Sequence, residues 1–238
     1  MSITEATGHS LPPSPRPFAG NRLPGSPAAL TDDHQVLQRA GARIRFTRGE
    51  TIFNEGDPAD NAYSVVCGAV RLCKHLADGR RQIAQFLLPG DFFSFAEMPE
   101  HTFSAEAIGD VVLVCYPQRQ IERLSDERPG LRRFFASLLM QRVKDVQNHL
   151  VLLGRQTAKE KVASFLVMLM QKSGVEADER LEVPMNRQDI ADFLGLTIET
   201  VCRVLSAMKR RKMIDISELH EVVIRDADAL CAFADGVD

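Results

Sequence analysis

The chain has 238 residues, of which 45% are apolar and 26% are charged, and its formal net charge at pH 7 is −3. This length suits one large domain or two small ones. The acidic balance argues against a protein that coats nucleic acid indiscriminately, so any contact with DNA has to come from a local basic patch. The longest apolar runs, such as residues 163–170, are much shorter than a membrane span, and no signal-peptide pattern is present. We therefore expect a cytoplasmic protein without membrane contact.

The spacing of cysteine and histidine favours neither a metal site nor an enzyme. The cysteines are odd in number and never form a CxxC pair, so we expect free thiols in a reducing compartment. The histidines show no HExxH spacing, and the sequence has no nucleophile elbow, phosphate loop or paired-carboxylate motif. We predict that the protein is not an enzyme and carries no metal or other cofactor. The cysteines are Cys67, Cys73, Cys115, Cys202 and Cys231.

The first segment, residues 1–30, is predicted to be a flexible tail. It contains six prolines with interspersed glycine and serine. Such a segment buries too little apolar surface to offset the entropy lost on ordering.

Residues 31–128 are predicted to form a β-rich domain. Short apolar alternations at residues 63–66, 70–74 and 82–87 are separated by turn residues, and "DVVLVCYP" supplies a last strand. Asp78 and Gly79, between two of these strands, are a strong hairpin signal. The regular recurrence of turns favours an all-β sandwich or barrel.

A long helix is predicted for residues 129–155, with Pro129 at its start. Apolar residues follow each other by three or four positions with polar residues between them, which is a heptad pattern. The helix could pack on its own β-domain or join two copies of the chain. Phe134, Phe135, Leu138 and Met140 widen the stripe at its N-terminal end. We expect that half to pack on the β-domain and the later half to form a dimer. The predicted dimerisation residues are Ala136, Leu139, Val143, Val146, Leu150 and Leu153.

The remaining segment, residues 156–238, begins after a predicted break near residues 154–157. Asn186 is placed to cap a helix over residues 187–194, with Asp189 at the reciprocal capping position. Gly195 then forms a sharp turn, and Thr197 caps the next helix. Two short helices joined in this way are a candidate helix-turn-helix.

The spacing around Gly195 supports this candidate. If Gly195 is the ninth position of the unit, Ala191 is the fifth, Val201 the fifteenth and Val204 the eighteenth. The helices cross closely at these positions. The fifth position needs a small residue, the ninth a residue that tolerates positive φ, and the fifteenth and eighteenth compact apolar residues. We predict a DNA-binding unit; a structural helical hairpin is the alternative.

The second helix of the unit carries the candidate base-reading residues. Its apolar face, formed by Val201, Val204, Leu205 and Met208, should point inward. Arginine reads guanine with a bidentate fork and glutamate accepts from cytosine. Glu199 and Arg203 are four residues apart and share a face, so an exposed salt bridge worth under ~0.5 kcal/mol is the alternative. The predicted base-reading residues are Thr197, Ile198, Glu199, Cys202 and Arg203.

A run of cations ends this helix and suits both its negative pole and contacts with DNA phosphates. A solvated charged face is the alternative. Residues 213–226 are predicted to form two strands joined at residues 218–220, which would be the wing of a winged helix-turn-helix. The predicted phosphate-contacting residues are Arg187, Thr200, Lys209, Arg210 and Lys212.

The order of these parts resembles that of the CRP/FNR superfamily of bacterial transcription regulators, over about residues 35–235. "LTIETVCRVL" is similar to the FNR branch, whose recognition helix carries the pattern E-x-x-S-R. Glu199 and Arg203 match this pattern, while Cys202 stands where serine is usual. The resemblance implies an α+β fold with an N-terminal antiparallel β-roll like those that bind cyclic nucleotides, a dimerisation helix and a C-terminal winged helix-turn-helix. It also implies a homodimer on double-stranded DNA at a TTGA-type palindrome, in contact with RNA polymerase.

Two departures from the superfamily narrow the resemblance. Residues 1–66 contain no cysteine, so the N-terminal thiolate group that holds the FNR iron–sulfur cluster is missing. Where CRP holds cyclic AMP, "FAE" at residues 95–97 replaces Gly-Glu-Leu, and Phe103 and Ser104 replace Arg-Ser. Without that arginine a cyclic phosphate lacks its bidentate partner. The chain therefore resembles the FixK-type group, which implies an activator of genes for microaerobic or anaerobic respiration or nitrogen fixation; a repressor remains an alternative.

Without a bound ligand, the activity could be regulated by the amount of protein, by proteolysis or by chemistry at a thiol. Cys202 is the candidate thiol, because a helix N-terminus and the adjacent Arg203 favour the thiolate and its oxidation. The alternative is that Cys202 is only a small residue in place of serine. A haem- or small-molecule-gated regulator is a further alternative, with His75, His101 or His149 as the haem ligand.

Overall fold

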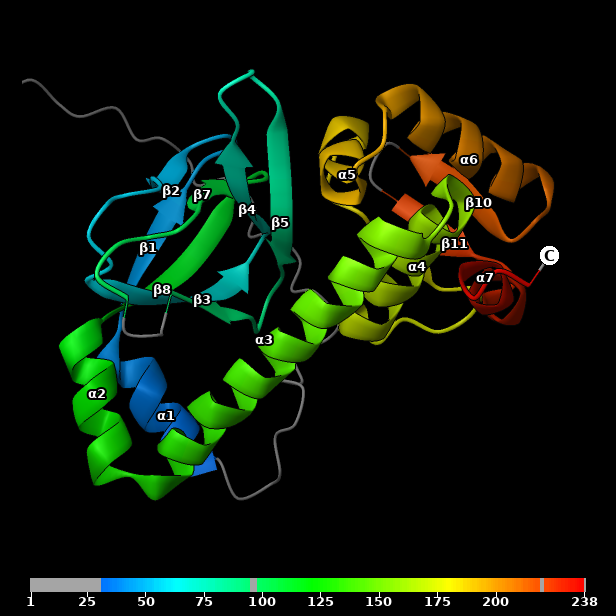
Figure 1. Ribbon diagram of the computed structural model, residues 1–238. Helices are drawn as coiled ribbons and strands as arrows, with labels where there is room; N and C mark the ends of the chain where they lie inside the picture. The colour runs from blue at the N-terminus through cyan, green and yellow to red at the C-terminus, as the bar shows by residue number, and fades with distance from the viewer. Residues whose placement is uncertain (1–30, 95–97, 219–220, 238) are drawn as a thin grey trace, which may run out of the picture.

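The computed structural model describes residues 31–94, 98–218 and 221–237. Over these ranges a β-rich N-terminal part is followed by one long helix and a mainly helical C-terminal part (Figure 1). This order confirms the predicted α+β class, with N-terminal antiparallel sheets and a C-terminal winged helix-turn-helix. The predicted tail, residues 1–30, lies outside the described residues.

The N-terminal part is a β-roll of two antiparallel sheets, one in the order β1-β8-β3-β6 and the other in the order β2-β7-β4-β5. The strands expected at residues 63–66, 70–74 and 82–87 are confirmed as β3, β4 and β5. The predicted hairpin is also confirmed, because β4 pairs with β5 and Gly79 turns between them with φ +85°. The strands are β1 (Ala42–Phe46), β2 (Thr51–Phe53), β3 (Asn61–Cys67), β4 (Val70–His75), β5 (Arg81–Leu87), β6 (Phe92–Phe93), β7 (Ser104–Ala107) and β8 (Val111–Pro117).

The two faces of β8 serve two different cores because successive side chains of a strand point to opposite sides. Val111 and Leu113 face the space between the sheets, where they join the rings of Phe53, Tyr63 and Phe93. The alternate residues of β8 face outward to the helices. The β-roll therefore has a filled interior and a second apolar face for helix packing.

Three helices cover that second face: α1 (Thr31–Ala40), α2 (Gln118–Glu127) and α3 (Pro129–Arg155). Phe134 and Phe135 of α3 meet the Phe92 ring edge-on at 5.8 and 5.9 Å. This confirms that the N-terminal half of the long helix packs on its own β-roll. Helix α1 was not predicted from the sequence.

The expectation for Met140 is wrong. Its side chain is 70% exposed, although Phe134 and Phe135 are buried. An α-helix turns about 100° per residue, so Met140 lies about 240° around the helix from Phe134 and faces away from the β-roll.

The C-terminal part begins after the predicted break: α3 ends at Arg155, and Thr157 caps α4 with Glu160 in a reciprocal capping box. The predicted wing strands are β10 and β11, and β9 completes their sheet; the turn at residues 219–220 lies outside the described residues. Helix α7 was not predicted. The elements are α4 (Ala158–Ser173), β9 (Arg180–Glu182), α5 (Arg187–Leu194), α6 (Ile198–Arg210), β10 (Ile214–Glu218), β11 (Glu221–Ile224) and α7 (Ala227–Ala234).

The helix-turn-helix geometry follows the sequence prediction. Asn186 and Asp189 form the capping box of α5, and Gly195 ends that helix with φ +62°. Ala191 and Val201 are fully buried where α5 and α6 cross. In the described part of the chain, none of the helices is both long and apolar enough to span a membrane.

Gly195→Ala should lower the free energy of unfolding by about 1 kcal/mol, because an alanine in left-handed backbone carries that cost. The added methyl group itself meets only Leu153, at 3.6 Å. Urea unfolding at one fixed protomer concentration measures the change.

Gly154→Ala is the matched control, since Gly154 lies within α3 and has open space around it. Alanine in a helix should raise the same free energy by about 0.5–1 kcal/mol. Effects of the same sign in both variants would contradict this account.

Candidate nucleic-acid interface

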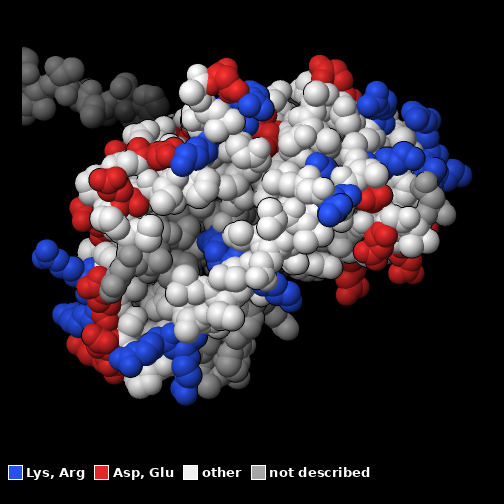
Figure 2. All heavy atoms as spheres, viewed as in Figure 1, with Lys and Arg blue, Asp and Glu red and all other residues white. Residues whose placement is uncertain are grey.

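Helix α6 lies at the surface of the molecule, at the end remote from the β-roll (Figure 1). The Thr197 hydroxyl caps it by accepting from the backbone N–H of Thr200 at 3.3 Å. Figure 2 shows Lys and Arg side chains gathered over this end of the molecule. A local basic surface therefore exists on a chain whose net charge is negative.

One face of α6 is buried and holds the helix in place. The four residues predicted to point inward are all buried, at most 6% exposed, in a core shared with α4 and α5. These residues are Val201, Val204, Leu205 and Met208. The opposite face is left to solvent.

That opposite face presents the predicted base-reading side chains at the N-terminal end of α6. Glu199, Cys202 and Arg203 are exposed, and Ile198 is partly exposed. Thr197 is exposed as well, although its hydroxyl is engaged as the cap. Side chains in this position can enter the major groove of DNA.

Glu199 and Arg203, both among the described residues, do not form the salt bridge that was the alternative interpretation. Arg203 donates to the Thr200 hydroxyl at 3.4 Å instead. Hydrogen bonds from the Glu199 backbone N–H and from Thr197 hold the pKa of the Glu199 carboxyl below its ordinary value. Glu199 is therefore an ionised acceptor at neutral pH.

The predicted phosphate-contacting cations differ in their surroundings. Arg210, the last residue of α6, and Lys212, two residues beyond it, are exposed. Lys209 instead pairs with Asp215 of the wing at 2.9 Å and donates to the carbonyl of Ile216. Burial lowers the pKa of Arg187, and the charge of the neighbouring Cys202 acts in the opposite direction.

A hollow of about 480 Å³ lies between the start of α4, α6 and α7. Lys159 and the capping residue Thr157 line it together with Thr200 and Arg203. The N-terminus of α4 is therefore beside α6. The sequence did not predict that Lys159 lies near Arg203, because the two residues are 44 positions apart in the chain (203 − 159).

The apolar stripe of α3 is exposed over most of its length. Exposure rises from 44% at Leu139 to 61% at Val146 and 71% at Leu150. Ala136 and Val143 are exposed as well, and Met140 and Val151 add to the stripe. Leu153 differs from the other predicted dimerisation residues, because it is half-buried and lies beside the Gly195 turn of its own chain.

The β-roll contains a cavity of about 180 Å³. Sites for drug-sized ligands typically have about 300–1,000 Å³. Phe53, Leu72 and Phe103 are among its lining, and Glu100 is the one charged residue among its described lining residues. No guanidinium lines the described part of this cavity, so a cyclic phosphate would meet an apolar wall and a carboxylate.

The candidate haem ligands occupy three separate places. The His101 ring stacks on Phe53 at 3.5 Å and hydrogen-bonds to Ser94. His149 stacks on Phe193 at 4.2 Å. His75 is exposed at the end of β4.

One group among the described residues brings possible metal ligands together. Donor atoms of Cys73, His75 and Glu106 lie within 4.8 Å of one another on β4 and β7. Burial and the charge of Glu106 raise the pKa of the Cys73 thiol to about 11. Glu106 accepts two contacts from Arg71, at 2.7 and 2.8 Å, so a cation here would compete with a guanidinium.

Known proteins resemble the chain over most of its length. Residues 43–128 match the model of the cyclic nucleotide-binding domain, and residues 160–233 match that of the Crp-like helix-turn-helix domain. The nitrogen fixation regulation protein FixK of Bradyrhizobium diazoefficiens is 43% identical over 184 residues, which cover 76% of this chain and 77% of that protein. FixK of Azorhizobium caulinodans is 38% identical over 97% of this chain and 98% of its own length.

A solved structure agrees with these relatives. The structure of FixK2 from Bradyrhizobium japonicum is similar with a TM-score of 0.77 and 35% identity, and the match covers 81% of this chain and 96% of that one. The chain belongs to the CRP/FNR superfamily of transcription regulators and, within it, to the FixK-type group.

Proposed function

We propose that two copies of this chain, joined along α3, bind a TTGA-type palindrome in promoter DNA and activate genes for life at low oxygen or for nitrogen fixation. Relatives at 38–43% identity are named as regulators of nitrogen fixation, and a relative from Rhodopseudomonas palustris, 40% identical, is named as a transcriptional activatory protein. Activation further requires a contact with RNA polymerase. The alternative is a repressor that binds the same DNA site.

The observation that carries the proposal is the exposure of the N-terminal face of α6. Glu199, Cys202 and Arg203 project from a helix whose other face is locked in the core. In this role the Arg203 guanidinium binds guanine O6 and N7, and the Glu199 carboxylate accepts from cytosine N4. Arg210 and Lys212 then contact phosphates on either side of the groove and set the register without reading sequence.

The apolar stripe of α3 supports the dimer. A helix with exposed apolar residues at heptad spacing buries them against an equivalent helix. Two-fold symmetry then places two α6 helices about 34 Å apart, one turn of DNA, so a palindromic site matches the protein.

The β-roll supports a regulator that needs no cyclic nucleotide. Its cavity offers a cyclic phosphate no cationic partner among the described lining residues. A gate by a small apolar molecule or by haem is the alternative, and a Soret band in the purified protein would favour the haem.

Footprinting combined with transcription in vitro, using purified protein without added ligand, tests the whole proposal. We expect protection of a symmetric TTGA-type site and more transcript from a promoter that carries it. Less transcript would identify a repressor, and binding without preference for the palindrome over random DNA would refute the proposal.

Val146→Glu should convert the dimer to a monomer, because it places like charges against each other in the apolar seam. Sedimentation at micromolar concentration measures the mass. Gln147→Glu, an adjacent and already polar position, is the control and should leave the dimer intact. A wild-type monomer under these conditions would contradict the assignment of α3.

Arg203→Ala should weaken binding to the palindrome by about 1–3 kcal/mol and relax discrimination at one base pair. Lys212→Ala should instead weaken binding to all sequences alike and reduce the slope of affinity against salt concentration. Binding titrations on operator and random duplexes at several salt concentrations separate the two effects. An equal loss on both duplexes for Arg203→Ala would argue against base reading.

Peroxide should weaken DNA binding by oxidising Cys202 to a sulfinate or sulfonate, which places an anion against DNA phosphates. Cys202 is exposed on the reading face, and a Cys202→Ser variant tests whether it is the thiol that matters. Binding assays with and without peroxide should show loss for the wild type and retention for the variant. Equal losses in both proteins would exclude this thiol.

A further inference from the structure

The C-terminal part that carries α6 is joined to α3 by a short connection, residues 156 and 157, between the end of α3 at Arg155 and the start of α4 at Ala158. Both linking residues have extended backbone. Rotation about their few dihedral angles would swing α5 and α6 relative to α3. A contact away from this connection has to fix the angle if two reading heads are to match two half-sites.

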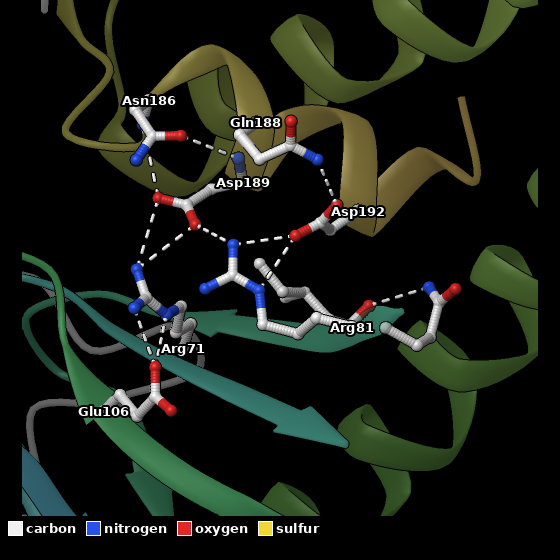
Figure 3. Close-up of polar contacts among 9 residues, drawn as sticks. Arg71, Arg81, Glu106, Asn186, Gln188, Asp189 and Asp192 are labelled. Atoms are coloured by element: carbon white, nitrogen blue, oxygen red, sulfur yellow. Dashed lines mark hydrogen bonds and ion pairs between the residues drawn. The ribbon is translucent and has the colours of Figure 1, made fainter. Parts of the chain in front are cut away.

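Such a contact exists between the β-roll and α5 (Figure 3). Arg81 of β5 donates to Asp189 at 2.6 Å and to Asp192 at 2.8 Å, and Arg71 of β4 donates to both oxygens of Asp189 at 3.1 and 3.3 Å. Glu106 of β7 holds Arg71 from the other side. We call these five residues the ionic clamp.

The clamp is shielded from solvent and its members satisfy one another. The Asp189 side chain is 1% exposed, and those of the other four members are 13–18% exposed. Burial acts to lower the pKa of Arg81, but its bonds with Asp192 and Asp189 outweigh burial and raise it. Removing one partner from such a cluster leaves a buried charge without compensation, which is far more costly than losing a surface pair.

Each side of the clamp is anchored in its own domain. Asp189 accepts from the backbone N–H of Asn186 and completes the capping box of α5. Arg71 is paired with Glu106 within the sheet. The bonds between the two sides therefore add a directional restraint to the docking, in which Ile83 and Phe86 of the β-roll join the apolar core of the C-terminal part.

An apolar contact lies beside the clamp but allows more freedom of angle. Phe86 of β5 meets Phe193 of α5 at 5.1 Å and Phe165 of α4 at 6.0 Å. Ring contacts of this kind tolerate sliding and rotation, whereas a planar guanidinium bonded to two carboxylates has one preferred direction. The clamp supplies the directional part of the docking.

In this docked arrangement the reading face of α6 is open to solvent. The clamp therefore holds the C-terminal part with this face of α6 accessible. We infer that Arg71 and Arg81 are positioning residues for operator recognition: by holding Asp189 and Asp192 they set the spacing and angle between the two reading heads of the dimer. This inference rests on the proposed function, the binding of a palindrome by a dimer.

The test uses the 238-residue chain and the variant Arg81→Gln, which removes the charge and leaves a shorter, neutral polar side chain. Arg80→Gln is the matched control: Arg80 is the preceding residue, it is 76% exposed, and it pairs with Asp78 inside the hairpin. Sedimentation and thermal melting verify that each protein is a folded dimer.

Fluorescence anisotropy at one salt concentration measures affinity for inverted repeats of TTGA whose central spacers differ by single base pairs, and for a random duplex. Each added base pair turns one half-site by about 35° and moves it by about 3.4 Å. The wild type should bind the best spacer about tenfold more tightly than its neighbours, because its heads are fixed in space. Arg80→Gln should show the same profile.

Arg81→Gln should bind the best spacer about tenfold less tightly and discriminate between spacers by about threefold or less, while its affinity for random DNA stays within about twofold. Should Arg81→Gln fail to fold, Asp192→Asn removes the same pair from the helix side.

The outcomes separate the two proposals. A folded Arg81→Gln or Asp192→Asn dimer that keeps the wild-type spacer profile overturns the positioning role and leaves the proposed function standing. A uniform loss on every duplex, with spacer discrimination unchanged, also overturns it. A wild type that does not prefer any inverted repeat over random DNA refutes the proposed function and the inference with it.

Discussion

The docking of α5 on the β4–β5 side of the β-roll determines where the recognition helix lies. Phe86 brings the sheet against Phe165 and Phe193, and the two arginines beside it bond the carboxylates of α5. Since α3 and α4 are joined by a short connection, this docking sets the direction of α6. The exposed face of α6, the wing and the hollow beside α4 all keep their places relative to α3 because of it.

We propose two tasks for helix α3, because its surroundings differ along its length. Its first turns bury Leu131, Phe134 and Phe135 against the β-roll, and its later turns leave Val146 and Leu150 exposed. The same rod therefore ties the β-roll rigidly to the apolar seam proposed for the dimer.

Residues 43–128 match the cyclic nucleotide-binding domain, but the described lining of the β-roll cavity is mainly apolar and contains no arginine or lysine. The outer face of the β4–β5 hairpin carries the arginines that hold the DNA-binding domain. In this chain the sheet is thus better equipped to dock a neighbouring domain than to bind an anionic ligand. Arg71 of β4 bonds both Glu106 of β7 and Asp189 of α5. The position of α5 therefore depends directly on the positions of these two strands.

The local features of this protein were determined by the sequence alone. The Asp78-Gly79 hairpin, the capping box at Asn186 and the close crossing at Ala191 and Gly195 each depend on residues a few positions apart. Backbone sterics and side-chain size act at that range, so the fold class and the two faces of α6 could be predicted. The spacing of apolar residues along α3 is also a local feature, so the helix could be predicted as well.

The relation between the parts was decided by the tertiary structure. Asp189 was interpreted from sequence as a helix cap, yet it also bonds Arg71, 118 positions away, and is fully buried for that reason. Leu153 continues the heptad but lies beside Gly195 of its own chain, and Met140 turns away from the β-roll that Phe134 contacts. The spacing of residues along the chain does not encode these contacts. They depend on how the surfaces of two folded domains pack against each other.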